Sequence, residues 1–190
     1  MSPQQETKIR KLGIFTLAQA EGLGVTQQSL SRLVKAGRIK RAGRGIYLHP
    51  KARVTKEVGF QIACAKFGPK SAIGGLSALF HYGLAEQVPG QIWVLVPQGQ
   101  RSIVRSYRLI RTKTDLAKAI VGKKGYKIAT VERAILEGLK LSSKIGERTA
   151  ITAARRAIEK RLTTESKLGK AAQELGLEAV LTRYFEMIAP

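Results

Sequence analysis

The amino-acid sequence predicts an α+β protein, and three features carry that prediction. Residues 16–36 contain two short amphipathic helix patterns joined by a Gly-Leu-Gly-Val turn. Residues 39–48 have the alternation and the glycines of a β-hairpin. The β-branched, apolar run 91–96 is typical of a buried strand, and helical patterns dominate residues 130–187. We therefore predict an N-terminal helix-turn-helix with a hairpin, followed by a mixed α+β domain with a small sheet and several helices.

The two N-terminal helices are predicted from their capping residues. Thr16 and Gln19 have the spacing of a capping box, in which each side chain bonds the backbone of the other residue. Thr26 is the expected N-cap of a second helix over residues 27–36, and Gly37 supplies the left-handed stop. The segment therefore reads as a helix-turn-helix.

The second helix has two chemically different faces. Leu30, Leu33 and Val34 fall on one face by their three-to-four spacing. The opposite face carries glutamine and arginine, which can pair with adenine and guanine in the major groove, while glutamate is absent from residues 22–56. Base contact is the favoured interpretation, and an ordinary solvated helix is the alternative. The predicted DNA-contacting residues here are Thr26, Gln27, Gln28, Ser31, Arg32 and Lys35.

The hairpin adds a predicted wing. Period-two alternation places Ile46 and Leu48 inward and their neighbour Tyr47 outward. A helix-turn-helix followed by a basic hairpin is the outline of a winged helix-turn-helix, whose wing can contact phosphates or a minor groove. A plain hairpin with solvated arginines is the alternative. The predicted DNA-contacting residues of the wing are Lys40, Arg41, Arg44 and Tyr47.

The charge of the chain favours a polyanionic partner. Thirty-four Lys and Arg residues against 13 Asp and Glu residues give a formal net charge of +21. The densest block is residues 99–127, where nine basic residues face one acidic residue. We predict a second phosphate-contacting face here, with RNA or an acidic protein as alternative partners and a solvated surface as the simplest alternative. Its predicted members are Arg101, Arg105, Arg108, Arg111, Lys123 and Lys124.

The pattern of helix and strand signals in the sequence changes after Pro50, so we predict domains over residues 1–50 and 51–190. One cysteine, Cys64, allows no internal disulfide, and no apolar run approaches the ~18 residues of a membrane span. The amino terminus is polar, so we expect a cytoplasmic protein without a membrane partner. The second domain is predicted to contain helices over 56–67, 75–82, 131–141, 145–160, 164–175 and up to 187, with strands over 91–96 and 101–111 in a meander.

Catalytic and metal-binding patterns are not evident in the sequence. Asp115 is the single aspartate, so the paired carboxylates of two-metal enzymes would have to come from glutamates. His49 and His81 lie far apart, without nearby cysteines or acidic clusters. Residues 122–125, Gly-Lys-Lys-Gly, lack the spacing of a phosphate-binding loop and read as a basic loop. We expect no enzyme activity, metal or cofactor, and we assign Glu132 and Glu137 to a solvated helix face.

Four segments together resemble the AbiEi-type antitoxins of bacterial toxin–antitoxin systems. They are FTLAQAEGLGVTQQSLSRLVKAGRIKRAGRGIYLHP at 15–50, SALFHYGL at 77–84, IWVLVP at 92–97 and IATVERAILEGL at 128–139. One departure is Val131, since family members often have a proline after the capping residue.

The resemblance implies a winged-helix repressor that binds inverted repeats in the promoter of its own operon. It also implies a C-terminal antitoxin domain, over residues 51–190, that counteracts a nucleotidyltransferase-like toxin without a stable complex. Two other functional hypotheses remain open at this point: an ordinary transcription factor with a ligand-sensing or dimerising C-terminal domain, and an RNA-binding protein that uses the basic block.

Overall fold

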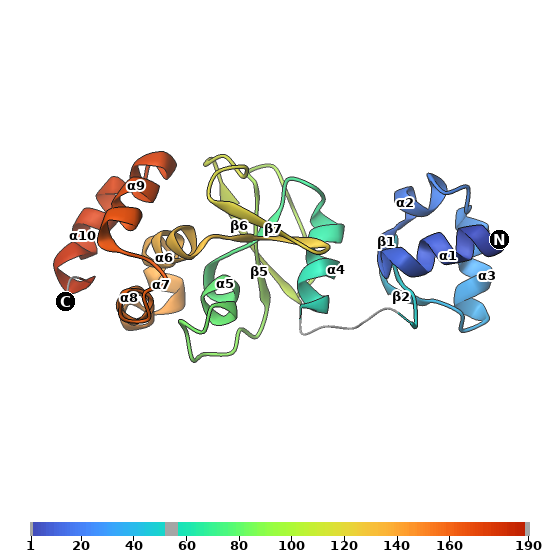
Figure 1. Ribbon diagram of the computed structural model, residues 1–190, viewed down its shortest axis with the longest axis horizontal. Helices are drawn as coiled ribbons and strands as arrows, with labels where there is room; N and C mark the ends of the chain where they lie inside the picture. The colour runs from blue at the N-terminus through green and yellow to red at the C-terminus, as the bar shows by residue number, and fades with distance from the viewer. Residues whose placement is uncertain (1, 52–56, 189–190) are drawn as a thin grey trace. The chain divides into compact units, whose positions relative to one another are not determined.

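The computed structural model describes residues 2–51 and 57–188, and its internal contacts divide the chain into two compact units, Met1–Gly68 and Pro69–Pro190 (Figure 1). Each unit is described by itself. The domain boundary predicted after residue 50 stays a proposal. Helix α4 (Val58–Phe67) is the segment that the two divisions assign differently.

The described part of the N-terminal unit has the element order of a winged helix-turn-helix. Strand β3 lies between β1 and β2, and both pairings are antiparallel. The prediction of an α+β protein with an N-terminal winged helix-turn-helix is therefore confirmed. Before α4, the elements are α1 (Pro3–Leu12), β1 (Ile14–Thr16), α2 (Leu17–Glu21), α3 (Gln27–Lys35), β2 (Lys40–Gly43) and β3 (Ile46–Leu48).

The predicted caps are those that the structure uses. Thr16 and Gln19 form the capping box of α2, with each backbone N–H bonded to the other side chain. The Thr26 hydroxyl accepts a hydrogen bond from the N–H of Ser29 at the start of α3. Gly37 has φ of +68° and follows the C-cap residue Ala36, so α3 ends at Lys35, just before the predicted stop. Local sequence therefore determines where both helices begin and end.

Helix α1 was not predicted, although its signal is present in the sequence. Ser2 and Gln5 form a second capping box, and Pro3 occupies the first helical position, where its missing N–H costs nothing. Ile9 of this helix is completely buried. The helix thus completes the core against which α3 packs.

Tyr47 corrects the predicted orientation of the wing. Its side chain is 5% exposed and its ring stacks on Phe15, with 5.7 Å between the ring centroids. Both rings belong to the core that also contains Leu30 and Leu33 of α3. Tyr47 is therefore a core residue, and the outward orientation on which its predicted DNA contact depended is wrong.

The reason is that the wing sheet is covered on both faces. Because side chains alternate along a strand, Ile46 lies on the face opposite Tyr47, and it too is buried. Helix α4 contacts all three strands of this sheet. The prediction assumed one solvated face, which would have placed Tyr47 outside. The predicted start of this helix at Lys56 lies outside the described residues.

The C-terminal unit is built on a mixed five-stranded sheet in the order β6-β5-β4-β8-β7 (Figure 1). The predicted meander is wrong, because β5 and β6 pair in parallel. Residues 98–106 connect them by returning to the other end of the sheet, where the N–H of Ile92 donates to the carbonyl of Ser106. The strands are β4 (Ala72–Ile73), β5 (Ile92–Pro97), β6 (Tyr107–Thr112), β7 (Ile120–Lys123) and β8 (Tyr126–Ala129).

The basic loop predicted at residues 122–125 is a hairpin turn. Strands β7 and β8 pair up to Lys123 and Tyr126, so Lys124 and Gly125 make the turn. Gly125 has φ of +83°, which a glycine adopts without strain.

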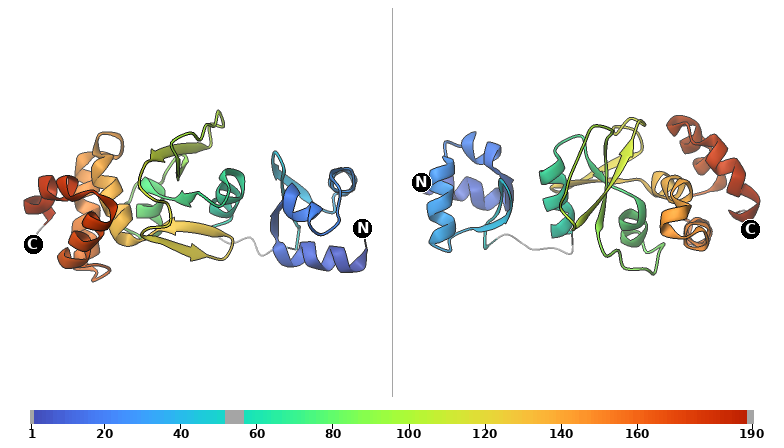
Figure 2. Two further views of the ribbon diagram at one scale, coloured as in Figure 1. Left: turned by 90° about the horizontal axis from the view of Figure 1, so that it is seen from above. Right: turned by 180° about the vertical axis from the view of Figure 1, so that it is seen from behind.

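Helices flank this sheet and gather beyond one end of it (Figure 2). Thr130 and Thr164 cap α6 and α9 as predicted, and Gly176 ends α9 in the left-handed conformation. The single helix predicted over 145–160 is divided at Gly146, which has φ of +97°. The helices are α5 (Gly75–His81), α6 (Val131–Lys140), α7 (Ser142–Ile145), α8 (Glu147–Glu159), α9 (Glu165–Leu175) and α10 (Glu178–Ile188).

Helix α6 carries a buried ion pair where a solvated helix face was expected. Arg133 is fully buried, and its Nε donates to Glu137 Oε1 at 3.2 Å. Burial raises the pKa of Glu137, and the guanidinium beside it opposes that shift. Glu132 is half-buried and accepts a hydrogen bond from the Thr163 hydroxyl. The solvated assignment fails because α5, α8, α9 and α10 all contact α6.

The position of Tyr47 gives the first testable prediction. Tyr47→Ala removes a buried ring and should destabilise the protein by about 3–5 kcal/mol, whereas Tyr47→Phe should cost about 1 kcal/mol or less. Urea unfolding followed by circular dichroism measures both. A Tyr47→Phe variant that folds normally but no longer binds DNA would show that the hydroxyl contacts DNA after all.

Candidate nucleic-acid interface

Helix α3 presents a continuous polar face to solvent. Leu30 and Leu33 bury the opposite face, at 0% and 8% exposure. The Ser31 hydroxyl donates to the carbonyl of Gln27, so it is turned onto its own helix. Among the described residues, Gln28, Arg32 and Lys35 have no side-chain hydrogen bond or ion pair. The exposed residues of this face are Thr26, Gln27, Gln28, Ser31, Arg32 and Lys35.

Helix α1 fixes the turn that orients α3. The Gln5 amide nitrogen donates to the carbonyls of Leu23 and Gly24, at 3.1 and 3.2 Å. Gly24 is left-handed, with φ of +74°, and a Cβ there would lie 3.1 Å from the same amide nitrogen. Gln5 therefore caps its own helix and also donates hydrogen bonds to two backbone carbonyls of the turn between α2 and α3.

An ion pair ties α1 to the end of α3. Arg38 Nη2 lies 2.6 Å from Glu6 Oε1, and this hydrogen bond lowers the pKa of Glu6. Both side chains are about half exposed, so the pair adds little stability by itself. Because Arg38 is engaged in this pair, the cations that remain for a ligand are those of α3 and of the wing.

The wing carries further cations along β2 and at its tip, where Arg44 lies. Lys40, Arg41 and Arg44 are exposed, and Arg41 Nε donates to the carbonyl of Gly43 at 3.3 Å. Gly45 has φ of +71° and makes the turn into β3. With Tyr47 in the core, the wing's contribution to an interface consists of these three cations.

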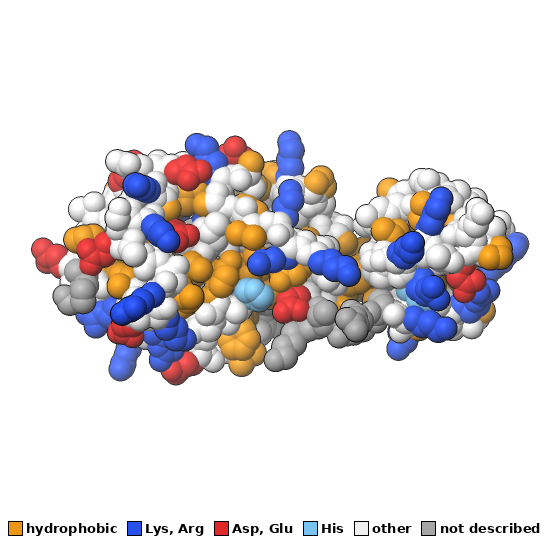
Figure 3. Space-filling model, in the orientation of Figure 1, with side chains coloured by type: hydrophobic (Ala, Val, Ile, Leu, Met, Phe, Trp, Pro, Cys, Tyr) orange, Lys and Arg blue, Asp and Glu red, His pale blue; other side chains and the backbone are white. Residues whose placement is uncertain are grey.

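Figure 3 shows that blue Lys and Arg side chains predominate on the face of the N-terminal unit in view, with one red acidic group among them. Residues 1–50 contain nine basic and two acidic residues. Since the field of such a surface attracts polyanions, the electrostatics agree with the polar face of α3.

The predicted second basic face is divided in the structure. Arg101 and Arg105 are exposed in the connection between β5 and β6. Arg108 lies over the Trp93 ring at 4.4 Å, while Arg111, on the opposite side of β6, donates to the carbonyl of Gln100. Strand β6 is at one edge of the sheet, whereas Lys123 and Lys124 lie at the β7–β8 turn of the other edge. The structure therefore divides the arginines between the β5–β6 connection and the two faces of β6, and it separates all of them from the lysines.

The histidines have structural surroundings. His49 is buried, its Nδ1 accepts the N–H of Lys51, and burial lowers its pKa. His81 lies edge-on to Tyr82 and Tyr126. Within residues 2–51 and 57–188, no group of three metal-ligating side chains occurs. None of the helices in these ranges has the length and hydropathy of a membrane span.

Comparison with solved structures gives a similar fold over the whole chain. The crystal structure of the RV2827C protein from Mycobacterium tuberculosis matches with a TM-score of 0.58 and 12% sequence identity, over 100% of this chain and 82% of that chain. At this identity the likeness concerns the fold alone. No curated protein gives a significant match.

A family model matches the N-terminal segment of the chain. Residues 6–50 match the model described as "Transcriptional regulator, AbiEi antitoxin". The matched segment runs from α1 to the end of the wing, the part of the chain in which the exposed face of α3 was found. The resemblance inferred from the sequence motifs is therefore confirmed over residues 6–50, where the chain is similar to the regulators that this model describes.

Proposed function

We propose that this protein is an autoregulating antitoxin that represses its own operon by binding inverted repeats in the promoter. The observation that carries the proposal is the exposed polar face of α3, backed by Leu30 and Leu33 in the core. Gln28 and Arg32 are the residues we assign to base edges, because their side chains offer bidentate contacts and are exposed on that face. Lys35 and the wing cations Lys40, Arg41 and Arg44 are assigned to phosphates.

The antitoxin part of the proposal concerns the C-terminal unit. The resemblance of the sequence motifs to AbiEi-type antitoxins implies a domain that counteracts a nucleotidyltransferase-like toxin without forming a stable complex with it, and the description of the family model as an antitoxin is consistent with such a role. We assign this activity to residues 51–190, as a domain separate from the one that binds the operator. Arg101 and Arg105 are proposed as additional phosphate contacts of this domain, because both are exposed in one connection.

Base readout by α3 predicts a sequence-dependent loss of affinity. Gln28→Ala and Arg32→Ala should each cost about 1–3 kcal/mol at the matched operator and little on random DNA, because each variant removes a base contact. Fluorescence anisotropy at fixed salt measures both affinities. Arg148→Ala, which removes an exposed charge of α8, is the control and should leave the difference between the two DNAs unchanged. Equal losses on both DNAs would assign α3 to backbone anchoring.

The autoregulatory role predicts a footprint on the DNA upstream of the protein's own gene. Protection should cover two inverted half-sites and should disappear in the Gln28→Ala, Arg32→Ala double variant. Co-expression of an adjacent nucleotidyltransferase-like gene should be toxic without this protein and tolerated with it. Rescue that persists in the double variant would place the antitoxin activity outside α3, as proposed. A footprint without rescue from the toxic gene would contradict the antitoxin role and would indicate an ordinary repressor.

The arginines of the β5–β6 connection predict a change in salt dependence. Replacing Arg101 and Arg105 by alanine should flatten the slope of log affinity against log salt by about 0.9 for each phosphate that the protein no longer neutralises. The control removes two exposed charges elsewhere in the same unit, Lys144 and Lys170. If both double variants have the slope of the unmodified protein, this connection does not contact DNA.

A further inference from the structure

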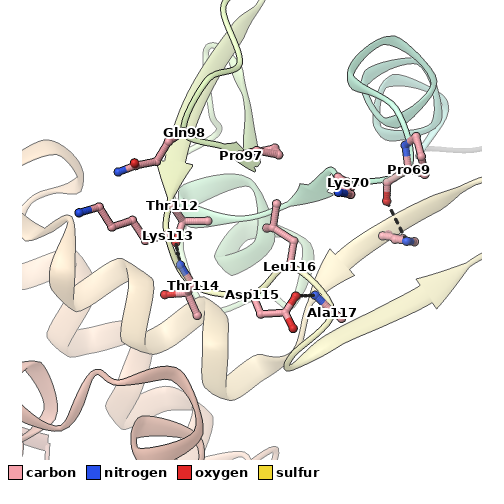
Figure 4. Close-up of a pocket in the computed structure, with 11 residues that line it drawn as sticks. Pro69, Lys70, Pro97, Gln98, Thr112, Lys113, Thr114, Asp115, Leu116 and Ala117 are labelled. Carbon is pink, nitrogen blue, oxygen red and sulfur yellow. Dashed lines mark hydrogen bonds between the residues drawn. The ribbon is translucent and has the colours of Figure 1, made fainter.

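A cavity of about 550 Å³ opens at one end of the five-stranded sheet (Figure 4). The parallel strands β5 and β6 both end at it, at Pro97 and Thr112, and the segment before β4 forms another wall. The crevice beyond the carboxyl ends of parallel strands is a frequent ligand-binding position in α/β sheets, and this volume is in the range of small-molecule sites.

The lining of the cavity is cationic. Lys70, Lys113 and Lys127 line it, together with one acidic residue, Asp115. Asp115 Oδ1 accepts the N–H of Ala117 at 2.8 Å, which fixes the carboxylate on its own loop. Lys127 Nζ donates to the carbonyl of Pro69 at 2.9 Å, which keeps the ammonium at the wall. Three ammonium groups against one carboxylate favour an anionic ligand.

The loop that forms the floor is fixed from behind by a buried side chain. Arg133 Nη1 donates to the carbonyls of Asp115 and Lys118, at 2.8 and 2.6 Å. Ala119 at the end of this loop has φ of +49°, a conformation that an alanine keeps only where its surroundings impose it. The N–H of Thr114 also donates to the Thr112 hydroxyl. The cavity is therefore held in shape without a ligand.

The cavity also offers apolar surface. Pro69, Pro97 and Leu116 line it, and Figure 4 shows Leu116 between the Lys70 side and the Thr112–Lys113 side. A bare inorganic anion would leave this surface in water. A ligand that combines a phosphate with an organic moiety would cover it and would satisfy the ammonium groups as well.

We propose that this cavity binds a small organic phosphate, with its phosphate held by Lys70 and Lys127 on the Pro69 side and its organic part over Leu116. A concave site favours such a ligand over the backbone of a duplex, which would contact a rim or a ridge. The inference uses only residues of the C-terminal unit and does not depend on operator binding.

Calorimetry on the full chain with 5′-AMP, inorganic phosphate and adenosine tests the proposal. Saturable binding of 5′-AMP is expected, with weaker binding of inorganic phosphate and none of adenosine. Lys70→Ala and Lys127→Ala should each raise the Kd for 5′-AMP about ten-fold, since each removes a charge-assisted contact. Lys70→Arg should keep most of the affinity, and Lys144→Ala, an exposed lysine of α7, should have no effect.

Several outcomes would overturn the proposal. Absence of heat from both 5′-AMP and phosphate would mean that the cavity takes no phosphate. Phosphate binding that equals or exceeds 5′-AMP binding would make it an inorganic-anion site. Equal losses in Lys144→Ala would assign the binding to overall charge, and displacement of 5′-AMP by short duplex DNA of random sequence would assign the cavity to nucleic acid. Thermal melting establishes that each variant is folded, and Lys127→Gln replaces Lys127→Ala if the alanine variant is not.

Discussion

The packing of α3 onto the N-terminal core is the constraint on which the functional interpretation depends. Leu30 and Leu33 must be buried together with Ile9 and Phe15, and each such side chain contributes about 1.5–3 kcal/mol when it leaves water. With that face fixed, the rotation of the helix about its axis is fixed as well. Gln28 and Arg32 then point to solvent by necessity. The same apolar contacts that stabilise the unit therefore determine which side chains a groove would meet.

Much of this unit could be predicted because its signals are local. Thr16, Thr26 and Gly37 act within four residues of themselves, so their spacing in the sequence determines the helix ends directly. Tyr47 could not be predicted in the same way. Whether its side chain is buried or exposed depends on what covers the two faces of the wing sheet. The helix that covers the other face, α4, begins ten residues after β3 ends. Alternation gives two faces and does not say which of them is solvated.

The buried pair of Arg133 and Glu137 shows the same limit for charged residues. A glutamate four residues after an arginine on a helix is the common pattern of a solvated face, and nothing within α6 distinguishes the two situations. The distinction comes from helices that surround α6 and from backbone carbonyls of the loop before β7, which accept two of the guanidinium's hydrogen bonds. Burying a charge is costly unless it is paired and hydrogen-bonded. Here the buried arginine of the pair also fixes the loop that lines the cavity, through the carbonyls of Asp115 and Lys118.

The dense basic block of the sequence resolves into two sets with different environments. Residues 99–127 carry nine cations, but the chain reverses and crosses the sheet between them, so adjacency in sequence does not become one surface. Arg101 and Arg105 lie in an exposed connection, where cations can meet an extended polyanion. Lys113 and Lys127 line a concave site bounded by an internally bonded loop, in which Lys127 can hold a small anion. Mutual repulsion among so many cations favours anionic ligands for both sets, and the shape of each surface decides which anion fits.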